Sequence, residues 1–241
     1  VTLTTSVCGS VVVTWTILTT PGGATTQYLY NGTTPAMTVL SITNASGLAE
    51  VTLHLGDIVG EYIVNASVST LWVHFHENAT AGAPATIAMS PAAYTQVSAD
   101  DNQTTVTATA YDQFGNLVDD GTIIAFAIND VGAANNGTGE YLSAATAPTT
   151  GGVASVTFYT SHRAGDLYNV SGSSGSAWNW TATVEVIPGA LANINITPAA
   201  FAGDADSVQD FDATGYDQWW NVNTSLTEEW ETSDPWGTIN Y

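Results

Sequence analysis

Apolar and polar residues alternate with a period of two along much of this chain. Residues 104–112 (TTVTATAYD) and 152–160 (GVASVTFYT) place apolar side chains on one face and Thr or Ser on the other, as half-buried strands do. Residues 122–128 (TIIAFAI) form a nearly continuous apolar run, which is typical of a central strand in a sandwich. Turn signals at Gly115-Asn116 and Asp120-Gly121 separate these runs, and helical spacing is sustained nowhere. The pattern predicts an all-β fold.

The pattern repeats along the chain with a step of 105 residues. TATAYDQFGN, ending at Asn116, returns as DATGYDQWWN, ending at Asn221. The segment SPAAY before the first copy matches TPAAF before the second. A different pair, GLAEVTLHLGDIVGEYIVNAS from Gly47 and GVASVTFYTSHRAGDLYNVSGS from Gly152, has the same step. Because two independent matches share one period, the chain contains a true internal repeat.

The repeat divides the chain into one complete unit and two partial ones. Residues 84–188 contain both the front and the back motif, residues 1–83 only the back motif, and residues 189–241 only the front motif. A unit of about a hundred residues made of short strands and turns describes a β-sandwich. The sequence therefore predicts tandem immunoglobulin-like β-sandwich domains, one complete and two partial or complemented by a partner.

The middle repeat resembles the bacterial Ig-like domains of invasin- and intimin-type adhesins. Those domains share an alternating strand, an Asp-x-x-Gly-Asn turn, an apolar strand, a Gly-x-Ala-x-Val strand and an Ala-Gly ending. The matching positions here are Asp112, Gly115, Asn116, Gly152, Ala154, Val156, Ala164 and Gly165. In the last repeat Trp219-Trp220 stands where the family has Phe-Gly. The resemblance implies the Ig-like fold and a setting in prokaryotic adhesins, archaeal surface layers or extracellular filaments.

The charge balance limits the partners. The net charge is −21, with 22 acidic residues, no lysine and Arg163 as the only strong base. Because almost no cation is available to neutralise phosphates, we expect no binding to nucleic acid or to an anionic membrane. Charged residues make up only 10% of the chain, so its polar surface is largely uncharged. This composition is typical of an extracellular or cell-surface β-protein.

Asn-x-Ser/Thr sequons are frequent and predict an N-glycosylated, exported protein. Nine candidate glycosylation sites are Asn31, Asn44, Asn65, Asn78, Asn102, Asn136, Asn169, Asn179 and Asn223. A tenth sequon, at Asn195, is followed by Pro198 and is the weakest. The dense sequons and the missing lysine favour an archaeal source over a Gram-negative adhesin. Cys8 is the single cysteine, so an intrachain disulfide is excluded and the alternatives are a small apolar residue or an intersubunit bond.

The first twenty residues are apolar but are interrupted by Thr, Ser and Gly and lack a basic start. They predict strands rather than a signal peptide or a membrane span. An export signal is therefore expected to have been removed or to lie outside this chain.

Metal sites have weak support. His74 and His76 share one strand face, but no third ligand has diagnostic spacing, which favours solvated histidines. Calcium, which takes several oxygen ligands, stays open as an alternative to a solvated acidic face. The acidic candidates for it are Asp100, Asp101, Asp119, Asp120, Asp204, Asp206, Asp210 and Asp212. We expect no cofactor otherwise.

Catalytic motifs are missing from the sequence. It contains no Gly-x-Ser-x-Gly elbow, phosphate-binding loop, dinucleotide fingerprint or zincin helix, and one arginine offers little to hold an anionic substrate. We therefore expect that the protein is not an enzyme.

Aromatic residues fall into two groups. Trp15, Phe126 and Trp230 occupy similar places in three strand-like segments and are predicted to pack in cores. Trp219, Trp220 and Trp236 are candidates for contact with another subunit, for core packing or for stacking on carbohydrate.

The partial repeats indicate self-association, because an incomplete sandwich leaves open sheet edges. The expected function is that of a structural subunit of an extracellular, pilus-like filament or a surface layer. Such subunits would join head to tail by donor-strand complementation, with residues 1–15 as the candidate donor. The alternative function is an adhesin or a receptor- or glycan-binding fibre module.

Overall fold

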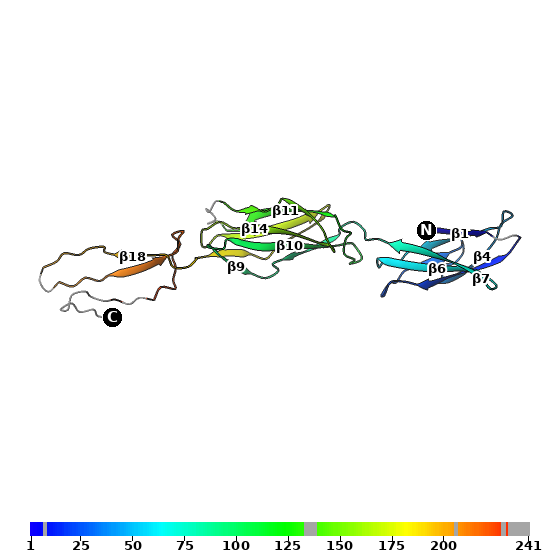
Figure 1. Cartoon of the computed structure of the whole chain (residues 1–241), viewed down its shortest axis with the longest axis horizontal. Helices are drawn as coiled ribbons and strands as arrows, with labels where there is room; N and C mark the ends of the chain where they lie inside the picture. The colour runs from blue at the N-terminus through cyan, green and yellow to red at the C-terminus, as the bar shows by residue number, and fades with distance from the viewer. Residues whose placement is uncertain (7–8, 133–138, 205–206, 228–229, 231–241) are drawn as a thin grey trace.

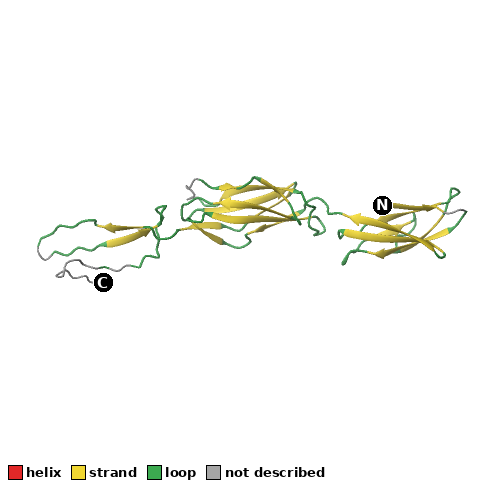
Figure 2. Ribbon diagram, viewed as in Figure 1, coloured by secondary structure: helices red, strands yellow, loops and turns green. Residues whose placement is uncertain are grey.

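The computed structural model describes residues 1–6, 9–132, 139–204, 207–227 and 230. Three β-rich units follow one another along the long axis of the molecule (Figures 1 and 2). The described residues form strands, turns and loops, and they include no helix that is long and apolar enough to cross a membrane. The predicted all-β fold is confirmed.

The N-terminal domain is a sandwich of a three-stranded and a four-stranded sheet, in the orders β1-β5-β3 and β4-β2-β6-β7. Its strands are β1 (Thr2–Ser6), β2 (Val12–Thr19), β3 (Tyr28–Tyr30), β4 (Thr38–Ile42), β5 (Leu48–His54), β6 (Gly60–Val68) and β7 (Leu71–Ala79). Trp15 lies fully buried at its centre, as predicted, and its indole N–H donates to Ser41 Oγ at 2.8 Å. This bond satisfies the one polar group that burial of the Trp side chain would otherwise leave without a partner.

The middle domain is a complete sandwich with the sheet orders β12-β14-β10-β8 and β13-β11-β15-β17-β9. Its strands are β8 (Thr86–Ser90), β9 (Thr95–Ser98), β10 (Gln103–Tyr111), β11 (Ile123–Asp130), β12 (Tyr141–Leu142), β13 (Thr146–Pro148), β14 (Val153–Tyr159), β15 (Leu167–Ser174), β16 (Ala177–Trp180) and β17 (Val184–Ile187). The predicted strands over 104–112, 122–128 and 152–160 correspond to β10, β11 and β14. Phe126 points into the core, as predicted, with 5% of its surface exposed.

The C-terminal unit begins with the hairpin-like pair β18 (Asn193–Thr197) and β19 (Asp212–Tyr216). Ile194 pairs with Gly215 in the same register in which Ile87 of β8 pairs with Ala110 of β10. The front half of the repeat is therefore built in the same way in the middle and C-terminal units.

The N-terminal domain differs from the middle domain in the first strands of the repeat. It has strands that correspond to β10 through β17, but the described residues contain no counterpart of β8 or β9. The segment proposed above as a donor strand belongs to this domain itself: β1 pairs with β5, and β2 carries the buried Val13 and Trp15. The strands that the structure describes within residues 1–15 are part of their own sandwich, so they are not free to act as a donor.

Candidate functional site: domain joints and an open groove

The joint between the first two domains is built around the Asp-x-x-x-Asn turn that follows β10. Asn116 Nδ2 donates to the carbonyl oxygen of Asp57 at 2.8 Å, and Val59 N–H donates to Asn116 Oδ1 at 3.2 Å. Both partners lie in the β5–β6 loop of the N-terminal domain. Asp112 Oδ2 accepts from the linker amide of Gly82 at 3.0 Å and from Asn116 Nδ2 at 3.0 Å. One turn thus binds the preceding domain and the linker together.

The same geometry returns one repeat later. Asn221 Nδ2 donates to His162 O at 2.8 Å, and Ala164 N–H donates to Asn221 Oδ1 at 2.8 Å. Asp217 Oδ2 accepts from the linker amide of Gly189 at 2.8 Å and from Asn221 Nδ2 at 2.7 Å. Asn221, His162, Ala164 and Asp217 each lie 105 residues after their counterparts in the first joint, and Gly189 of the linker lies 107 residues after Gly82. The turn that the sequence identified as a family motif is therefore also the device that joins consecutive domains.

The aspartate of each joint is held as a carboxylate. Burial alone would raise the pKa of Asp112, but hydrogen bonds from Asn116, Gly82 and Phe114 outweigh it, and the pKa is lowered. The pKa of Asp217 is lowered by the same balance, with donors in Asn221, Gly189 and Trp219. Backbone and amide N–H groups therefore stabilise the negative charge of each carboxylate.

The second joint has an aromatic contact in addition. Trp219 stacks on His162 of the middle domain, with ring centroids 3.7 Å apart and planes 12° from parallel. Trp220 has a φ of 65° at the position where the first joint has Gly115, with a φ of 85°. A bulky residue in this left-handed region is strained, by roughly 1–2 kcal/mol. The turn keeps its shape although Trp-Trp replaces Phe-Gly, and 67% of Trp220 is exposed.

Two open strand edges and an uncovered apolar face, together called the groove below, lie on the N-terminal domain where the middle domain carries its front strands. In the middle domain, β8 pairs with β10 and β9 pairs in parallel with β17. In the N-terminal domain β1 corresponds to β10 and β7 corresponds to β16 and β17, and both β1 and β7 are edge strands among the described residues. Their edges therefore present unpaired backbone groups.

The inner face of β7 is apolar and uncovered along this groove. Leu71 is 71% exposed and Val73 is 42% exposed, although both point to the side of the sheet that holds the core. At the matching position in the middle domain, Ala177 is buried. Asn179, which corresponds to Val73, donates from Nδ2 to the Ile87 carbonyl of β8 at 2.9 Å. The N-terminal domain thus has a binding surface for one further strand.

Exposed aromatic pairs mark the outer faces of both sandwiches. Trp72 is 67% exposed opposite Ser67, and Trp178 is 63% exposed opposite Ser173. The ring of His74 lies 4.4 Å from Trp72, and that of Trp180 lies 6.1 Å from Trp178. Sequence reasoning missed these pairs. The signal was available as Leu-Trp-Val-His and Ala-Trp-Asn-Trp at matching places in the repeat.

The predicted metal candidates do not assemble into a site in the described part of the chain. No group of three or more His, Cys, Asp or Glu side chains is close enough there to hold an ion. His76 Nδ1 lies 2.8 Å from Glu61 Oε1 on an exposed face. Asp100 instead belongs to the second joint, where it accepts from Ala190 N–H and Gln218 Nε2.

The predicted glycosylation sites differ in what their side-chain nitrogen does. Five of them donate Nδ2 to a carbonyl oxygen of the fold: Asn31, Asn102, Asn169, Asn179 and Asn223. Asn44 and Asn78 are exposed, and Asn65 is half-buried. Cys8, Asn136 and Trp236 lie outside the described residues, and so does Asp206.

Comparison with known proteins places the fold. The chain matches no family model and no curated protein. It is similar in structure to FdeC, an Escherichia coli adhesin, with a TM-score of 0.57 and 17% identity over 92% of this chain and 67% of FdeC. It is also similar to the D0-D1 domain of intimin, with a TM-score of 0.32 and 24% identity over 77% of this chain and 89% of that one. A third similar structure is invasin, a bacterial integrin-binding protein, with a TM-score of 0.43 and 18% identity over 94% of this chain and 44% of invasin. This chain therefore spans less than half of invasin. The FdeC match confirms the predicted tandem Ig-like architecture.

Proposed function

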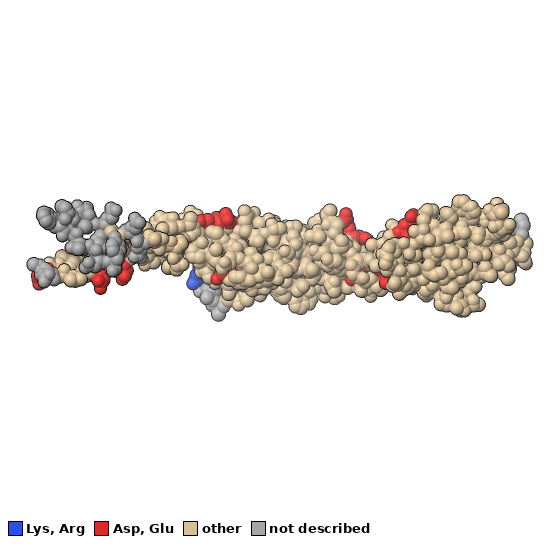
Figure 3. Space-filling model, turned by 90° about the horizontal axis from the view of Figure 1, so that it is seen from below, with Lys and Arg blue, Asp and Glu red and all other residues tan. Residues whose placement is uncertain are grey.

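We propose that this protein is a structural, non-catalytic segment of a cell-surface or extracellular assembly, a filament or a surface layer. In this role its domains form a stiff rod, and rods join head to tail when a strand of one copy fills the groove of the next. The surface of the rod supports an extracellular setting, since acidic groups are scattered over a largely uncharged exterior (Figure 3).

The observation that carries this proposal is the uncovered inner face of β7. Leu71, Val73 and the half-buried Phe75 lie along one line of an edge strand. Phe75 also contacts the buried Trp15, with ring centroids 5.7 Å apart, so a strand added here would extend the existing core. Strand addition supplies main-chain hydrogen bonds for affinity and alternate side-chain pockets for specificity. Repeating the contact from copy to copy is heterologous and produces a filament.

A charge placed inside the groove tests the proposal. Val73→Lys puts an ammonium group where the incoming strand would pack, whereas His74→Lys places the same group on the outer face of the same strand. We expect end-to-end oligomers, seen by light scattering and electron microscopy, for the wild-type chain and for His74→Lys, and monomers for Val73→Lys.

Two results would overturn the assembly proposal. The first is a wild-type chain that stays monomeric at high concentration. The second is a longer form of the chain in which a segment preceding Val1 protects the β7 edge from hydrogen exchange without any oligomer.

The exposed aromatic pairs favour a second candidate function, a glycan-binding fibre. Trp72 and Trp178 repeat on the outer faces beside serine side chains, and an exposed indole next to hydroxyl groups suits a neutral sugar. Titrating the full chain with neutral oligosaccharides while following tryptophan fluorescence tests this function. We expect saturable binding that Trp72→Ala combined with Trp178→Ala removes and that Trp220→Ala leaves unchanged.

A further inference from the structure

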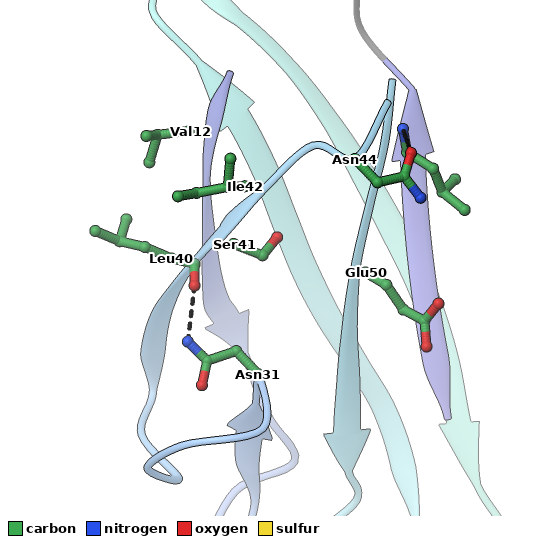
Figure 4. Close-up of a pocket in the computed structure, with 8 residues that line it drawn as sticks. Val12, Asn31, Leu40, Ser41, Ile42, Asn44 and Glu50 are labelled. Atoms are coloured by element: carbon green, nitrogen blue, oxygen red, sulfur yellow. Dashed lines mark hydrogen bonds between the residues drawn. The ribbon is translucent and has the colours of Figure 1, made fainter. Parts of the chain in front are cut away.

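A hollow of about 570 Å³ opens on the side of the N-terminal domain, between β4 of one sheet and β5 of the other (Figure 4). The residues that line it are Val12, Asn31, Leu40, Ser41, Ile42, Asn44, Leu48 and Glu50. Its size lies within the range of about 300–1,000 Å³ that is common for sites of small organic ligands. Two of the lining residues, Asn31 and Asn44, begin sequons.

One wall of the hollow is an uncovered apolar patch. Val12 is 50% exposed, Leu40 54% and Ile42 66%, and Figure 4 shows their side chains side by side. Val12 and Ile42 are cross-strand partners of β2 and β4, so the patch is a fixed part of the sheet. Isolated apolar residues on a surface need no explanation, but three adjacent ones around a hollow indicate a ligand or a cover.

Asn44 presents a free amide nitrogen at the rim of this hollow. Its Oδ1 accepts from Ser46 N–H at 2.9 Å and from Leu48 N–H at 3.1 Å. The backbone closes the same turn, because Asn44 N–H donates to Leu48 O at 2.9 Å and Gly47 N–H donates to Asn44 O at 2.8 Å. These bonds fix the side chain through its oxygen and leave Nδ2 without a partner in the described structure.

Asn31, on the other rim, is held in the opposite way. Its Nδ2 donates to Leu40 O at 2.7 Å, drawn as the dashed line in Figure 4, and its Oδ1 accepts from Thr33 N–H at 3.1 Å. A sugar on Asn31 would have to be accommodated beside the bond to Leu40, which already uses one of the two Nδ2 hydrogens. The two sequons at this hollow are therefore not equivalent.

We propose that Asn44 carries an N-linked glycan whose first sugars lie in this hollow and cover the patch formed by Val12, Leu40 and Ile42. A pyranose ring has an apolar C–H face, which suits the patch, and hydroxyl groups at its edge. Glu50 provides a carboxylate acceptor for those hydroxyls at the far wall. The lack of basic side chains around the hollow suits a neutral sugar.

Attachment is a group transfer carried out by a separate glycosyltransferase. A lipid-phosphate-linked oligosaccharide is the co-reactant. The bond between Asn44 Nδ2 and the anomeric carbon forms, the bond from that carbon to the phosphate oxygen breaks, Nδ2 loses a proton, and the lipid phosphate leaves. No oxidant or reductant is needed. This inference does not depend on the assembly proposed above, because the hollow is remote from the open inner face of β7.

Glycopeptide mass spectrometry and calorimetry of the full chain test the proposal. The chain is made in a host that transfers N-glycans and in one that does not. Ser46→Ala removes the sequon without changing Asn44, and Asn78→Gln removes an exposed sequon that does not line this hollow. We expect a glycan on Asn44, and we expect Ser46→Ala to lower the Tm of the glycosylated N-terminal domain by about 4–8 °C. Asn78→Gln should leave that Tm unchanged.

The unglycosylated protein separates the effect of the sugar from that of the mutation. There, Ser46→Ala should have the same Tm as the wild type, because the oxygen of Asn44 still closes its turn. Ile42→Ser, which removes part of the patch but keeps the sequon, should reduce the Tm gain that glycosylation brings. An unmodified Asn44 in the glycosylating host would overturn the proposal, as would a loss of Tm on Ser46→Ala that is equal in both hosts.

Discussion

Replacing Asn116 with alanine should loosen the joint between the first two domains while leaving both sandwiches folded. The substitution removes the bond from Nδ2 to Asp57 O and the bond from Val59 N–H to Oδ1, which are both interdomain bonds. Asn116 lies in a turn and contributes to neither hydrophobic core. The loss should therefore appear in the geometry of the joint rather than in the unfolding of either domain.

The size of the effect follows from the two lost bonds. A typical intramolecular hydrogen bond contributes about 0.5–1.5 kcal/mol net, so two bonds give about 1–3 kcal/mol. An energy of that size shifts an equilibrium between closed and open joints by roughly 5- to 150-fold toward the open form. The substitution also removes the bond from Asn116 Nδ2 to Asp112 Oδ2, which should loosen the turn itself.

Distances between spin labels measure the joint directly. Labels on Thr52 of β5 and Ser155 of β14, both exposed, report on the two domains in a Cys8→Ser background. We expect one narrow distance distribution for the parent chain and a broad one for Asn116→Ala. Gln113→Ala, in the same turn but exposed and free of side-chain bonds in the described structure, should keep the narrow distribution. An unchanged distribution for Asn116→Ala would refute the assignment of Asn116 to the joint.

Three further predictions concern the joints. Gly189→Ala should weaken the second joint, because the new Cβ would clash with a carboxylate oxygen of Asp100 that the joint already uses. Gly82→Ala should be tolerated, because its nearest contact would lie at 3.6 Å, and thermal unfolding and the same distance measurement check both. Trp220→Gly should stabilise the C-terminal unit by roughly 1 kcal/mol by relieving the left-handed backbone, measured by denaturant unfolding, and an unchanged midpoint would contradict the strain. The pKa of both joint aspartates is lowered on folding, so their contribution is fully present above about pH 4, the ordinary aspartate range, and is lost as the pH falls through the lowered values. Scattering profiles recorded over a falling pH series should therefore report a stiff rod at about pH 7 that becomes flexible only below the ordinary aspartate range.

The sequence predicted the sandwiches because their signal is local. The alternation of β10 and β14 fixes which side chains enter the core, and Val106 and Val156, which face each other in that core, could be assigned from period two alone. The repeat step then located the matching turns at Asp112 and Asp217. The core positions of Trp15 and Phe126 followed from the same apolar runs.

The joints could not be predicted because half of their contacts are backbone atoms. The carbonyl oxygens of Asp57 and His162 accept the bonds, and neither position has a side chain that marks this role. The groove was indicated only in part. Counting motifs showed that the first repeat was incomplete, but its open strands became clear only from pairing partners, which also placed residues 1–15 inside their own domain.

The way in which the joints are made predicts how the molecule responds to concentrated salt. They use hydrogen bonds to backbone atoms and to amides, and the contact between His76 and Glu61, the one salt-bridge contact in the described part of the chain, is not among the bonds of either joint. Dissolved salt screens interactions between separated charges but has little effect on such short bonds. The same screening weakens the mutual repulsion that a net charge of −21 imposes along the molecule. Concentrated salt should therefore leave the rod stiff while making it easier for neighbouring rods to lie side by side.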